Sequence, residues 1–592
     1  MWNNETKKGV FFNLILSLVL TAVFFLVVRL FYSFTYGVID DPFIETVLSG
    51  AYTGTPDAHV VYIKYPLAAL LAFLYSIQPA INWHFGLLVG CFVICVFLVN
   101  FRICSNVSKF LNKLIFTVLF MLMFLLCLAK LFITAHYSMC AGVLVGTGIF
   151  YFLTIKYEST KLNLALNYIV SLLLLYLAYC LRARTLFMLM PIAFIAFLYK
   201  FFNAKPAFKK QNIIRWIIFP IVLFIGVGAI ELVHSSAYKS DAWKQFLEFN
   251  DARTTLYDFY GVPDYEGNEE FYDSIGVEKE RVFMYKDRYY LEFTEGMEDD
   301  MLEKIADYSV ARIKEKYPTM ERLSLSVKAL GDNLSQTVYQ PMSWIATGLA
   351  LALIVCCLIF QRLRAAIMIF LGKLAALVPW IYMIYMGKPT YRVTSGIWFA
   401  EILFLIGMMI DNAEPVREKL SRFSRRTSVA KTIIKVIVAA LMAAAMLFGI
   451  ITYYPKTEKS VKNILKTASV RDQLQDWCRE REENLYILES DVINLGFNYK
   501  TMDGRFLNFY YPGGWPSKMP QAKEQIWARY GIDSIESGII ENDHVYLVAF
   551  ADKDMTYWTD YYRLNYPEAK LQKTETIKFD GTEFAIYQMQ GK

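Results

Sequence analysis

Two adjacent carboxylates, Asp40 and Asp41, follow the first long apolar segment of the chain. A carboxylate close to a hydroxyl group can take its proton while the oxygen attacks another centre, which is general-base catalysis. We therefore predict Asp40 and Asp41 as the catalytic pair. Asp41 precedes Pro42, so it also fits the N-cap of a helix. Because capping leaves Asp40 unexplained, we predict Asp40 first as the base and Asp41 as its neighbour in binding.

Cationic side chains approach the same level from other parts of the chain. Arg182 and Arg184 occupy a tight turn between two apolar segments, and Lys388 and Arg392 share a short polar stretch. Any one of them could simply extend to the membrane surface, as Lys and Arg near helix ends commonly do. Together, at the depth of lipid headgroups, they suit a phosphate or pyrophosphate. We predict that these four residues bind a lipid phosphate.

Two loops supply further candidates for substrate binding. These loop residues are His59, Lys64, Tyr65 and Arg253. Arg253 would share one helical face with Asn250 and Asp258, although an exposed amphipathic helix with ordinary ion pairs explains that pattern equally well. Trp515, after two glycines, could stack on a sugar, but the core of a small domain also needs its aromatic residues.

The residues favour chemistry without a cofactor. The other short outer loops hold no Asp-x-Asp pair, the histidines do not cluster, and the nine cysteines show no spacing typical of a metal site. A divalent metal could take part but is not favoured, so no metal ligands are predicted.

The composition places these residues in a membrane protein. Of the 592 residues, 56% are hydrophobic and only 19% are charged. Long apolar runs recur, each near the roughly 20 residues that cross a bilayer, and they are continuous, as in helices, rather than alternating. The net charge of +6 is modest and indicates loop asymmetry, so nucleic acid is not a predicted partner.

We predict an α-helical polytopic membrane protein with about eleven transmembrane helices. The segments run over residues 10–35, 82–101, 112–133, 138–155, 164–181, 185–201, 212–233, 339–360, 365–386, 393–411 and 431–453. With a cytoplasmic N-terminus, the strongly basic loops fall on the cytoplasmic side, as the positive-inside rule requires. The short apolar segment 66–78 would invert this pattern if it crossed, so we predict that it lies on the outer face. The predicted location is the cell membrane.

Four parts follow from this topology. They are a membrane module at 1–233 with its first outer loop at 36–81, a large and mostly helical extracytoplasmic loop at 234–338, C-terminal transmembrane helices at 339–453, and an extracytoplasmic α/β domain at 454–592. In the last part, helical stretches are predicted at 459–481 and 521–530, and strands at 485–488, 545–550 and 583–588.

In this layout the chain resembles the GT-C superfamily of polyprenyl-phosphate-dependent membrane glycosyltransferases, among them protein O-mannosyltransferases and aminoarabinose transferases. The resemblance covers residues 1–455 and rests on acidic residues after the first span, surface helices in the first outer loop, and a large loop after the seventh span. Segments 249–258 and 509–515 are similar to pieces of bacterial cell-envelope glycosyltransferases. The resemblance implies a GT-C-like fold and a catalytic base at Asp40 or Asp41.

The chain also departs from that superfamily. It has Asp-Asp where mannosyl and aminoarabinose transferases typically carry Asp-Glu, and it lacks the second-loop acidic motif of oligosaccharyltransferases. The resemblance therefore does not imply the metal site of the oligosaccharyltransferases.

The predicted function is transfer of a sugar from a polyprenyl-phosphate donor to a cell-envelope glycan or a lipid-linked acceptor on the outer face. The reaction would be inverting, with an aspartate as base and the leaving lipid phosphate held by cations. The expected partners are this donor, this acceptor and membrane lipid. One alternative is an O-antigen-type polysaccharide polymerase that depends on loop arginines such as Arg253. A second is a lipid-linked sugar flippase or transporter, a class that should show internal symmetry and broken midplane helices, and neither is evident in the sequence.

Overall fold

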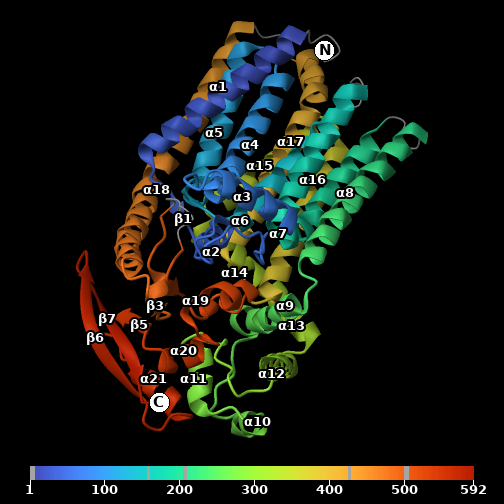
Figure 1. Ribbon diagram of the computed structural model, residues 1–592. Coiled ribbons are helices and arrows are strands. Elements are labelled where there is room, and N and C mark those ends of the chain that lie inside the picture. The colour runs from blue at the N-terminus through green and yellow to red at the C-terminus, as the bar shows by residue number, and fades with distance from the viewer. Residues whose placement is uncertain (1–6, 157–160, 205–209, 424–427, 499–505, 592) are drawn as a thin grey trace.

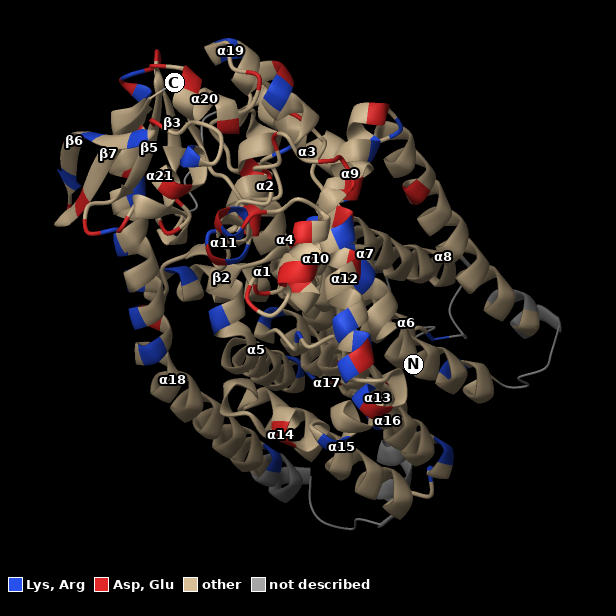
Figure 2. Ribbon diagram, turned by 90° about the horizontal axis from the view of Figure 1, so that it is seen from below, with Lys and Arg blue, Asp and Glu red and all other residues tan. Residues whose placement is uncertain are grey.

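The computed structural model describes residues 7–156, 161–204, 210–423, 428–498 and 506–591 and is mostly helical. Long helices form a bundle at one end of the molecule, and shorter helices with a β-sheet form a second part at the other end (Figure 1). Charged residues are frequent along this second part, whereas α5 (Phe110–Ile133) and α8 (Lys210–Ala237) carry few (Figure 2).

Nine helices of the described chain are long and apolar enough to cross a membrane. They lie within α1 (Lys7–Phe31), α4 (Trp83–Asn106), α5, α7 (Lys161–Asn203), α8, α15 (Met342–Ile359), α16 (Leu363–Tyr385), α17 (Tyr391–Phe423) and α18 (Ser428–Arg479). Many of their large apolar side chains are exposed, such as Leu30 at 81% and Phe448 at 73%. A surface of this kind is stable in lipid and not in water. The protein is therefore a helical, multi-pass membrane protein.

The predicted spans fall on these helices with two differences. α7 contains both segments predicted at 164–181 and 185–201, and its backbone is non-helical at Arg182, where φ is −159° and ψ is 96°. The segment predicted at 138–155 is α6 (Tyr137–Leu153), which has 17 residues and is not among the nine. The number of membrane crossings therefore stays a prediction.

The helix α6 lies at the centre of the bundle, and every residue along it is buried. Its glycines let α17 approach closely. A Cβ at Gly142 would lie 3.0 Å from the Cα of Gly396, and one at Gly146 would lie 2.9 Å from the Cα of Ala400. Packing of this kind holds membrane helices together, because hydrophobic burial contributes little between helices in lipid. The first residues of α6 are thereby fixed within the bundle.

A short parallel pairing joins two distant segments beside the start of α6. The strand β1 (Thr35–Tyr36) pairs with β2 (Thr134–Ala135). Gly37 follows β1, and only a residue without a side chain fits there, because a Cβ would lie 2.7 Å from the Thr134 carbonyl oxygen. The pairing brings the segment after α1 next to the segment before α6.

The helix α2 (Asp40–Ser49) begins directly after this pairing, with Asp40 and Asp41 in its first turn. Its N-cap residue is Ile39, and no side chain caps it. The N-cap role considered for Asp41 is therefore wrong. The segment predicted at 66–78 forms a separate helix, α3 (Tyr65–Ile77).

Between α8 and α15 the chain forms short helices outside the bundle. They are α9 (Asp241–Thr254), the π-helix η2 (Thr255–Tyr260), α10 (Glu269–Ser274), α11 (Lys279–Asp287), α12 (Met301–Lys316), α13 (Thr319–Lys328), α14 (Leu330–Ser335) and the 3₁₀-helix η3 (Thr337–Tyr339). We call this segment, residues 238–341, the large loop.

The helix α18 continues out of the bundle and ends at Arg479, where the C-terminal region (residues 480–591) begins. A five-stranded sheet has the order β4 (Phe509–Tyr510), β3 (Leu485–Leu488), β5 (Val545–Phe550), β7 (Thr582–Gln590) and β6 (Lys570–Phe579). β3 is parallel to β4 and β5, whereas β7 is antiparallel to β5 and β6. The short helical elements of this region are η4 (Val492–Asn494), η5 (Ala522–Trp527), α19 (Ala528–Tyr530), α20 (Ile535–Glu541) and α21 (Thr556–Arg563).

The C-terminal region packs directly on the segment that follows α2. The Leu507 N–H donates to the Ala51 carbonyl at 2.9 Å, and the Tyr52 hydroxyl donates to the Pro516 carbonyl at 2.7 Å. The bundle, the large loop and the C-terminal region therefore meet around α2.

Candidate functional site

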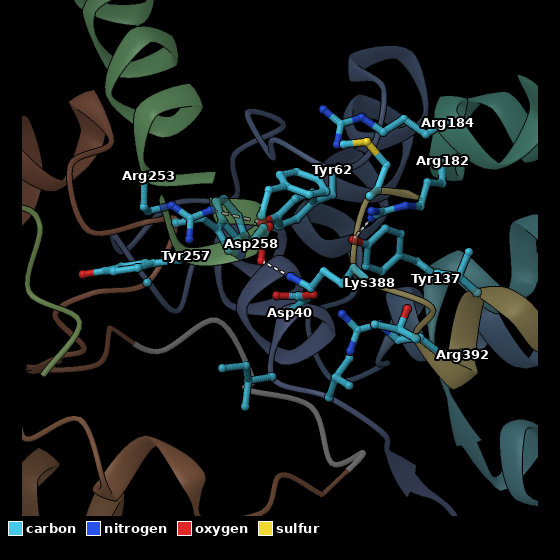
Figure 3. Close-up of a pocket in the computed structure, with 18 of the residues that line it drawn as sticks. Asp40, Tyr62, Tyr137, Arg182, Arg184, Arg253, Tyr257, Asp258, Lys388 and Arg392 are labelled. Carbon is cyan, nitrogen blue, oxygen red and sulfur yellow. Dashed lines mark hydrogen bonds and ion pairs between the residues drawn. The ribbon is translucent and has the colours of Figure 1, made fainter. Parts of the chain in front are cut away.

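A cavity of about 1090 Å³ lies where these three parts meet, and we call it the central cavity. It is lined by six of the ten residues predicted for the site, which are Asp40, Arg182, Arg184, Arg253, Lys388 and Arg392 (Figure 3). They come from α2, α7 at and just after its break, α9, the connection between α16 and α17, and the first turn of α17. The fold thus gathers side chains that are far apart in the sequence.

Asp40 contributes a carboxylate to the lining of the central cavity. Its side chain is 24% exposed, and its Oδ2 lies 4.0 Å from Nε2 of His136. His136 is the N-cap of α6, and its Nδ1 accepts the backbone N–H of Ser138 at 3.0 Å. Since Nδ1 is an acceptor, neutral His136 carries its proton on Nε2, the nitrogen next to the aspartates.

Asp41 does not line the central cavity and is fully buried. Its Oδ1 lies 3.0 Å from Nε2 of His84, and both side chains are 0% exposed. The same oxygen accepts the Tyr137 N–H at 3.3 Å, and Oδ2 lies 3.7 Å from Nε2 of His136. A buried carboxylate requires such partners. Asp41 therefore connects α2 to α4 and α6 and fixes the position of Asp40.

The surrounding charges favour the ionised form of Asp40. Burial raises the pKa of Asp40, but His136, Arg392 and Arg182 together lower it further, so its pKa lies below the usual value. Burial lowers the pKa of His136 even though Asp41 and Asp40 oppose this effect. The site therefore holds an ionised carboxylate beside a neutral imidazole at neutral pH.

Arg182 is positioned by the break in α7 and by aromatic residues. Its guanidinium donates a hydrogen bond to the Tyr137 hydroxyl. It also lies 5.1 Å from the ring centre of Tyr137 and 5.9 Å from that of Tyr62. Both rings line the central cavity. Because the helix is interrupted at Arg182, this cation lies at the wall of the central cavity although it belongs to a membrane helix.

The other cations differ in their existing partners. Lys388 pairs with Asp258 of the π-helix η2, as Figure 3 shows. Within the described part of the chain, the side chains of Arg184 and Arg392 make no hydrogen bond or ion pair. The central cavity thus offers cations with no carboxylate partner of their own.

Arg253 is held in place by neutral groups. It is 8% exposed and donates to Oδ1 of Asn250 at 3.1 Å and to the Tyr62 hydroxyl at 3.3 Å. Arg253 and Asp258 both line the central cavity, whereas Asn250 does not. The wider turn of the π-helix after α9 brings Asp258 to the same cavity, and π-helical turns of this kind are frequent at functional sites.

Three predicted substrate-binding residues, His59, Lys64 and Tyr65, lie outside the lining of the central cavity. The His59 ring stacks on Trp243 with 4.7 Å between ring centres. Lys64 pairs with Glu231 at 2.7 Å, and the Tyr65 N–H donates to His234 at 3.2 Å. The chain turns into α3 at this point, so these residues join α3 to α8 and α9 instead of the site.

The structure adds lining residues that the sequence did not indicate. Tyr62, Tyr137, Asp287 and Asp491 contribute polar groups. An apolar wall comes from α7 and α16 and consists of Phe187, Met188, Pro191, Val378, Pro379, Tyr382, Met383 and Met386. In the sequence, these apolar residues resemble any lipid-facing stretch. For Tyr137 the sequence offers one signal. It lies beside His136 just before the predicted span 138–155, where a side chain is close to the membrane surface.

The described residues include no group of three or more His, Cys, Asp or Glu side chains arranged to hold a metal ion. The chemistry available in the central cavity is proton removal by a carboxylate and charge stabilisation by cations. Comparison with known proteins adds no relative, because no family model, no curated protein and no solved structure matches the chain.

Proposed function

We propose that the protein is a membrane glycosyltransferase of the GT-C type. It transfers a sugar from a polyprenyl phosphate to a hydroxyl group of a cell-envelope acceptor at the outer face of the membrane. The observation that carries this proposal is the lining of the central cavity, which combines the Asp40 carboxylate, cations and an apolar wall. These three features match the base, the leaving phosphate and the lipid chain of such a reaction.

The apolar wall supports a lipid-linked donor. Its residues lie on α7 and α16, two helices that are apolar enough to cross a membrane. A polyprenyl chain packed along this wall would remain in contact with apolar surface while its phosphate reaches the cations of the cavity. The donor therefore enters from the side of the bilayer.

Cations of the central cavity bind the donor phosphate. Arginine offers paired N–H donors that match phosphate oxygens, and Arg182 and Arg392 both line the cavity. Arg392 has no ion-pair partner among the described residues, so phosphate binding breaks no existing pair there. Lys388 becomes available when its contact with Asp258 opens.

Asp40 acts as the general base. The acceptor oxygen attacks the anomeric carbon and forms the new glycosidic bond. The bond from that carbon to the phosphate oxygen breaks, and its electron pair leaves with the lipid phosphate. The hydroxyl proton passes to Asp40, and the cations stabilise the charge on the leaving phosphate. A single displacement inverts the configuration at the anomeric carbon.

The proposal takes the central cavity to open on the outer face. It retains the predicted topology, with a cytoplasmic N-terminus, about eleven membrane crossings, and the large loop and C-terminal region outside the cell membrane. Charged residues are concentrated on the large loop and the C-terminal region, which supports placing these two parts in water and the bundle in the membrane (Figure 2).

The test is transfer by the Asp40→Asn variant of the full chain in membranes of the native host. These membranes supply the lipid-linked sugars and the acceptor, and incorporation of labelled sugar into envelope glycan is measured. We expect transfer to fall roughly 10²- to 10⁴-fold. Binding of undecaprenyl phosphate to the purified variant should equal that of the wild type, and Asp251→Asn, an exposed substitution on α9, serves as the control.

Full transfer by Asp40→Asn would refute the role of Asp40. If Arg253→Gln then abolished the extension of lipid-linked oligosaccharides, the polymerase alternative would replace the proposal. The polymerase remains a second candidate function because Arg253, the loop arginine on which it would depend, is buried at the wall of the same cavity.

A further inference from the structure

One side of the central cavity is built by segments outside the bundle. We call it the extramembrane wall, and it includes Asp287, Tyr289, Asp491, Asn494, Gly514 and Trp515. The first two belong to the large loop and the other four to the C-terminal region. This wall brings together chain segments about two hundred residues apart, although nothing in the transfer chemistry above requires them.

We propose that the extramembrane wall binds the acceptor, and that the acceptor presents an uncharged glycan without a lipid carrier of its own at this site. The inference rests on the proposed function and narrows its acceptor. Three observations carry it. The central cavity has a single apolar wall on membrane helices, the extramembrane wall carries carboxylates, and the indole N–H of Trp515 has no hydrogen-bond partner in the described chain.

The central cavity has one apolar wall on membrane helices that suits a lipid chain. That wall is formed by α7 and α16, whereas the extramembrane wall is lined mainly by polar groups and glycines. Among the other described lining residues, only Val393 is an apolar side chain on a membrane helix, so a donor that occupies the apolar wall leaves no second surface of this kind for another polyprenyl chain. An acceptor that reaches the cavity from the extramembrane side meets hydrogen-bonding groups instead.

The extramembrane wall carries two carboxylates, Asp287 and Asp491. Arg253, the cation of the large loop that lines the same cavity, is held by Asn250 and Tyr62. Asp287 is exposed, and its side chain has no hydrogen bond or ion pair within the described chain. Asp491 is paired with Lys553. A phosphate or carboxylate on the acceptor would be repelled by Asp287, whereas the hydroxyl groups of a neutral sugar can donate hydrogen bonds to it.

Trp515 supplies an aromatic surface with an unused donor. Its side chain is 3% exposed and lines the central cavity, and its Nε1 has no hydrogen-bond partner among the described residues. Buried N–H groups are usually hydrogen-bonded in proteins. Of the six described tryptophans whose Nε1 has no partner, Trp515 is the one that lines the central cavity, so its Nε1 is available to a ligand that accepts a hydrogen bond. A sugar hydroxyl is such an acceptor, and the indole ring suits the apolar face of a sugar.

The backbone before Trp515 is locked onto the large loop. Gly513 has a φ of +79°, and a Cβ there would lie 2.1 Å from the Tyr289 carbonyl oxygen. The Gly513 N–H donates to Oε1 of Glu292 at 2.5 Å. A binding wall held this closely loses little conformational entropy when a ligand arrives.

The experiment compares two tryptophans with the same local feature. Trp527 also has a buried Nε1 without a partner in the described chain, but it lines a separate cavity of about 560 Å³. Trp515→Phe, Trp527→Phe and Asp287→Asn are assayed for transfer while the concentration of envelope glycan from the native host is varied at saturating donor. We expect Trp515→Phe to raise the KM for the glycan about fivefold to tenfold, the loss of one hydrogen bond, with the donor KM unchanged.

Asp287→Asn, an exposed substitution that does not endanger folding, should raise the same KM, and Trp527→Phe should leave it unchanged. Glycan separated by anion exchange should act as acceptor in the neutral fraction and not in the anionic one. An unchanged glycan KM in Trp515→Phe and Asp287→Asn, or a requirement for the anionic or lipid-linked fraction, would overturn this inference alone. Absence of transfer by the wild type would overturn the proposed function, and this inference with it.

Discussion

The neighbouring aspartates should respond in opposite ways to the same substitution. Asp40→Asn removes a carboxylate that is partly exposed and lies 4.0 Å from its nearest histidine nitrogen. We expect it to lower transfer roughly 10²- to 10⁴-fold and to change the free energy of unfolding by less than about 1 kcal/mol, as substitutions outside tight networks usually do. Asp41→Asn changes a side chain that is fully buried against His84 at 3.0 Å.

The cost of Asp41→Asn follows from its contacts. The new amide oxygen can still accept from His84 and from the Tyr137 N–H, but these bonds lose the charge of the carboxylate. The new NH₂ group replaces Oδ2, which lies 3.7 Å from Nε2 of His136, the nitrogen that carries the proton. Two donors then face each other without an acceptor. Weaker bonds and an unsatisfied buried donor together cost about 2 to 4 kcal/mol.

The assay measures unfolding of the purified variants in mixed detergent micelles beside transfer in membranes. Asp40→Asn should keep the unfolding midpoint and lose transfer, whereas Asp41→Asn should lower the midpoint and retain part of the transfer. A lower midpoint for Asp40→Asn would show that Asp40 is structural. A stable Asp41→Asn variant without transfer would make Asp41 the base and refute the reasoning from burial.

Three further predictions concern charge. The pKa of Asp40 is lowered and a base acts in its ionised form, so kcat/KM for the donor should decline only at a pH below the ordinary pKa of an aspartate. Arg392→Gln should move that decline to higher pH and Arg184→Gln much less; equal shifts would contradict the assigned causes. Asp258→Asn frees Lys388 and should lower the donor KM several-fold in the transfer assay, so a higher KM would refute competition between Asp258 and the phosphate. Burial raises the pKa of Glu292 to about 7, so its contribution to stability is present below a pH of about 4.3 and is lost as pH rises through about 7. The unfolding midpoint should fall over this range, and Glu292→Gln should flatten the profile; an unchanged slope would rule out Glu292 as its source.

The sequence predicts best those features that depend on local pattern. The long apolar runs fall on membrane helices, and the strands predicted at 485–488 and 545–550 are β3 and β5. The strand β6 was missed because Lys570–Phe579 is a mostly exposed edge strand with charged residues and little apolar alternation. A strand is recognised in a sequence by the alternation of apolar and polar residues, which arises when one face of the strand is buried, and this edge strand buries few of its side chains.

The site was predicted best where the chain itself fixes a side chain near the membrane surface. Arg182 and Arg392 sit at the ends or breaks of apolar segments, and both line the central cavity. His59 and Lys64 are closer to Asp40 in sequence, yet they lie elsewhere because the chain turns into α3. Trp515 lines the cavity on a backbone that packs at Gly513 against Tyr289, a contact between distant segments that no local sequence pattern indicates.

The arrangement of charges also gives the proposed reaction an order. Without a ligand, His136, Arg392 and Arg182 lower the pKa of Asp40, which keeps it ionised but makes it a weak base. A bound phosphate would offset these positive charges, so the pKa of Asp40 would rise and its carboxylate would become a stronger base. Proton removal from the acceptor is then favoured only when the donor phosphate is present. The same cations that hold the leaving group would therefore prevent Asp40 from activating a hydroxyl group, or water, before the sugar is in place.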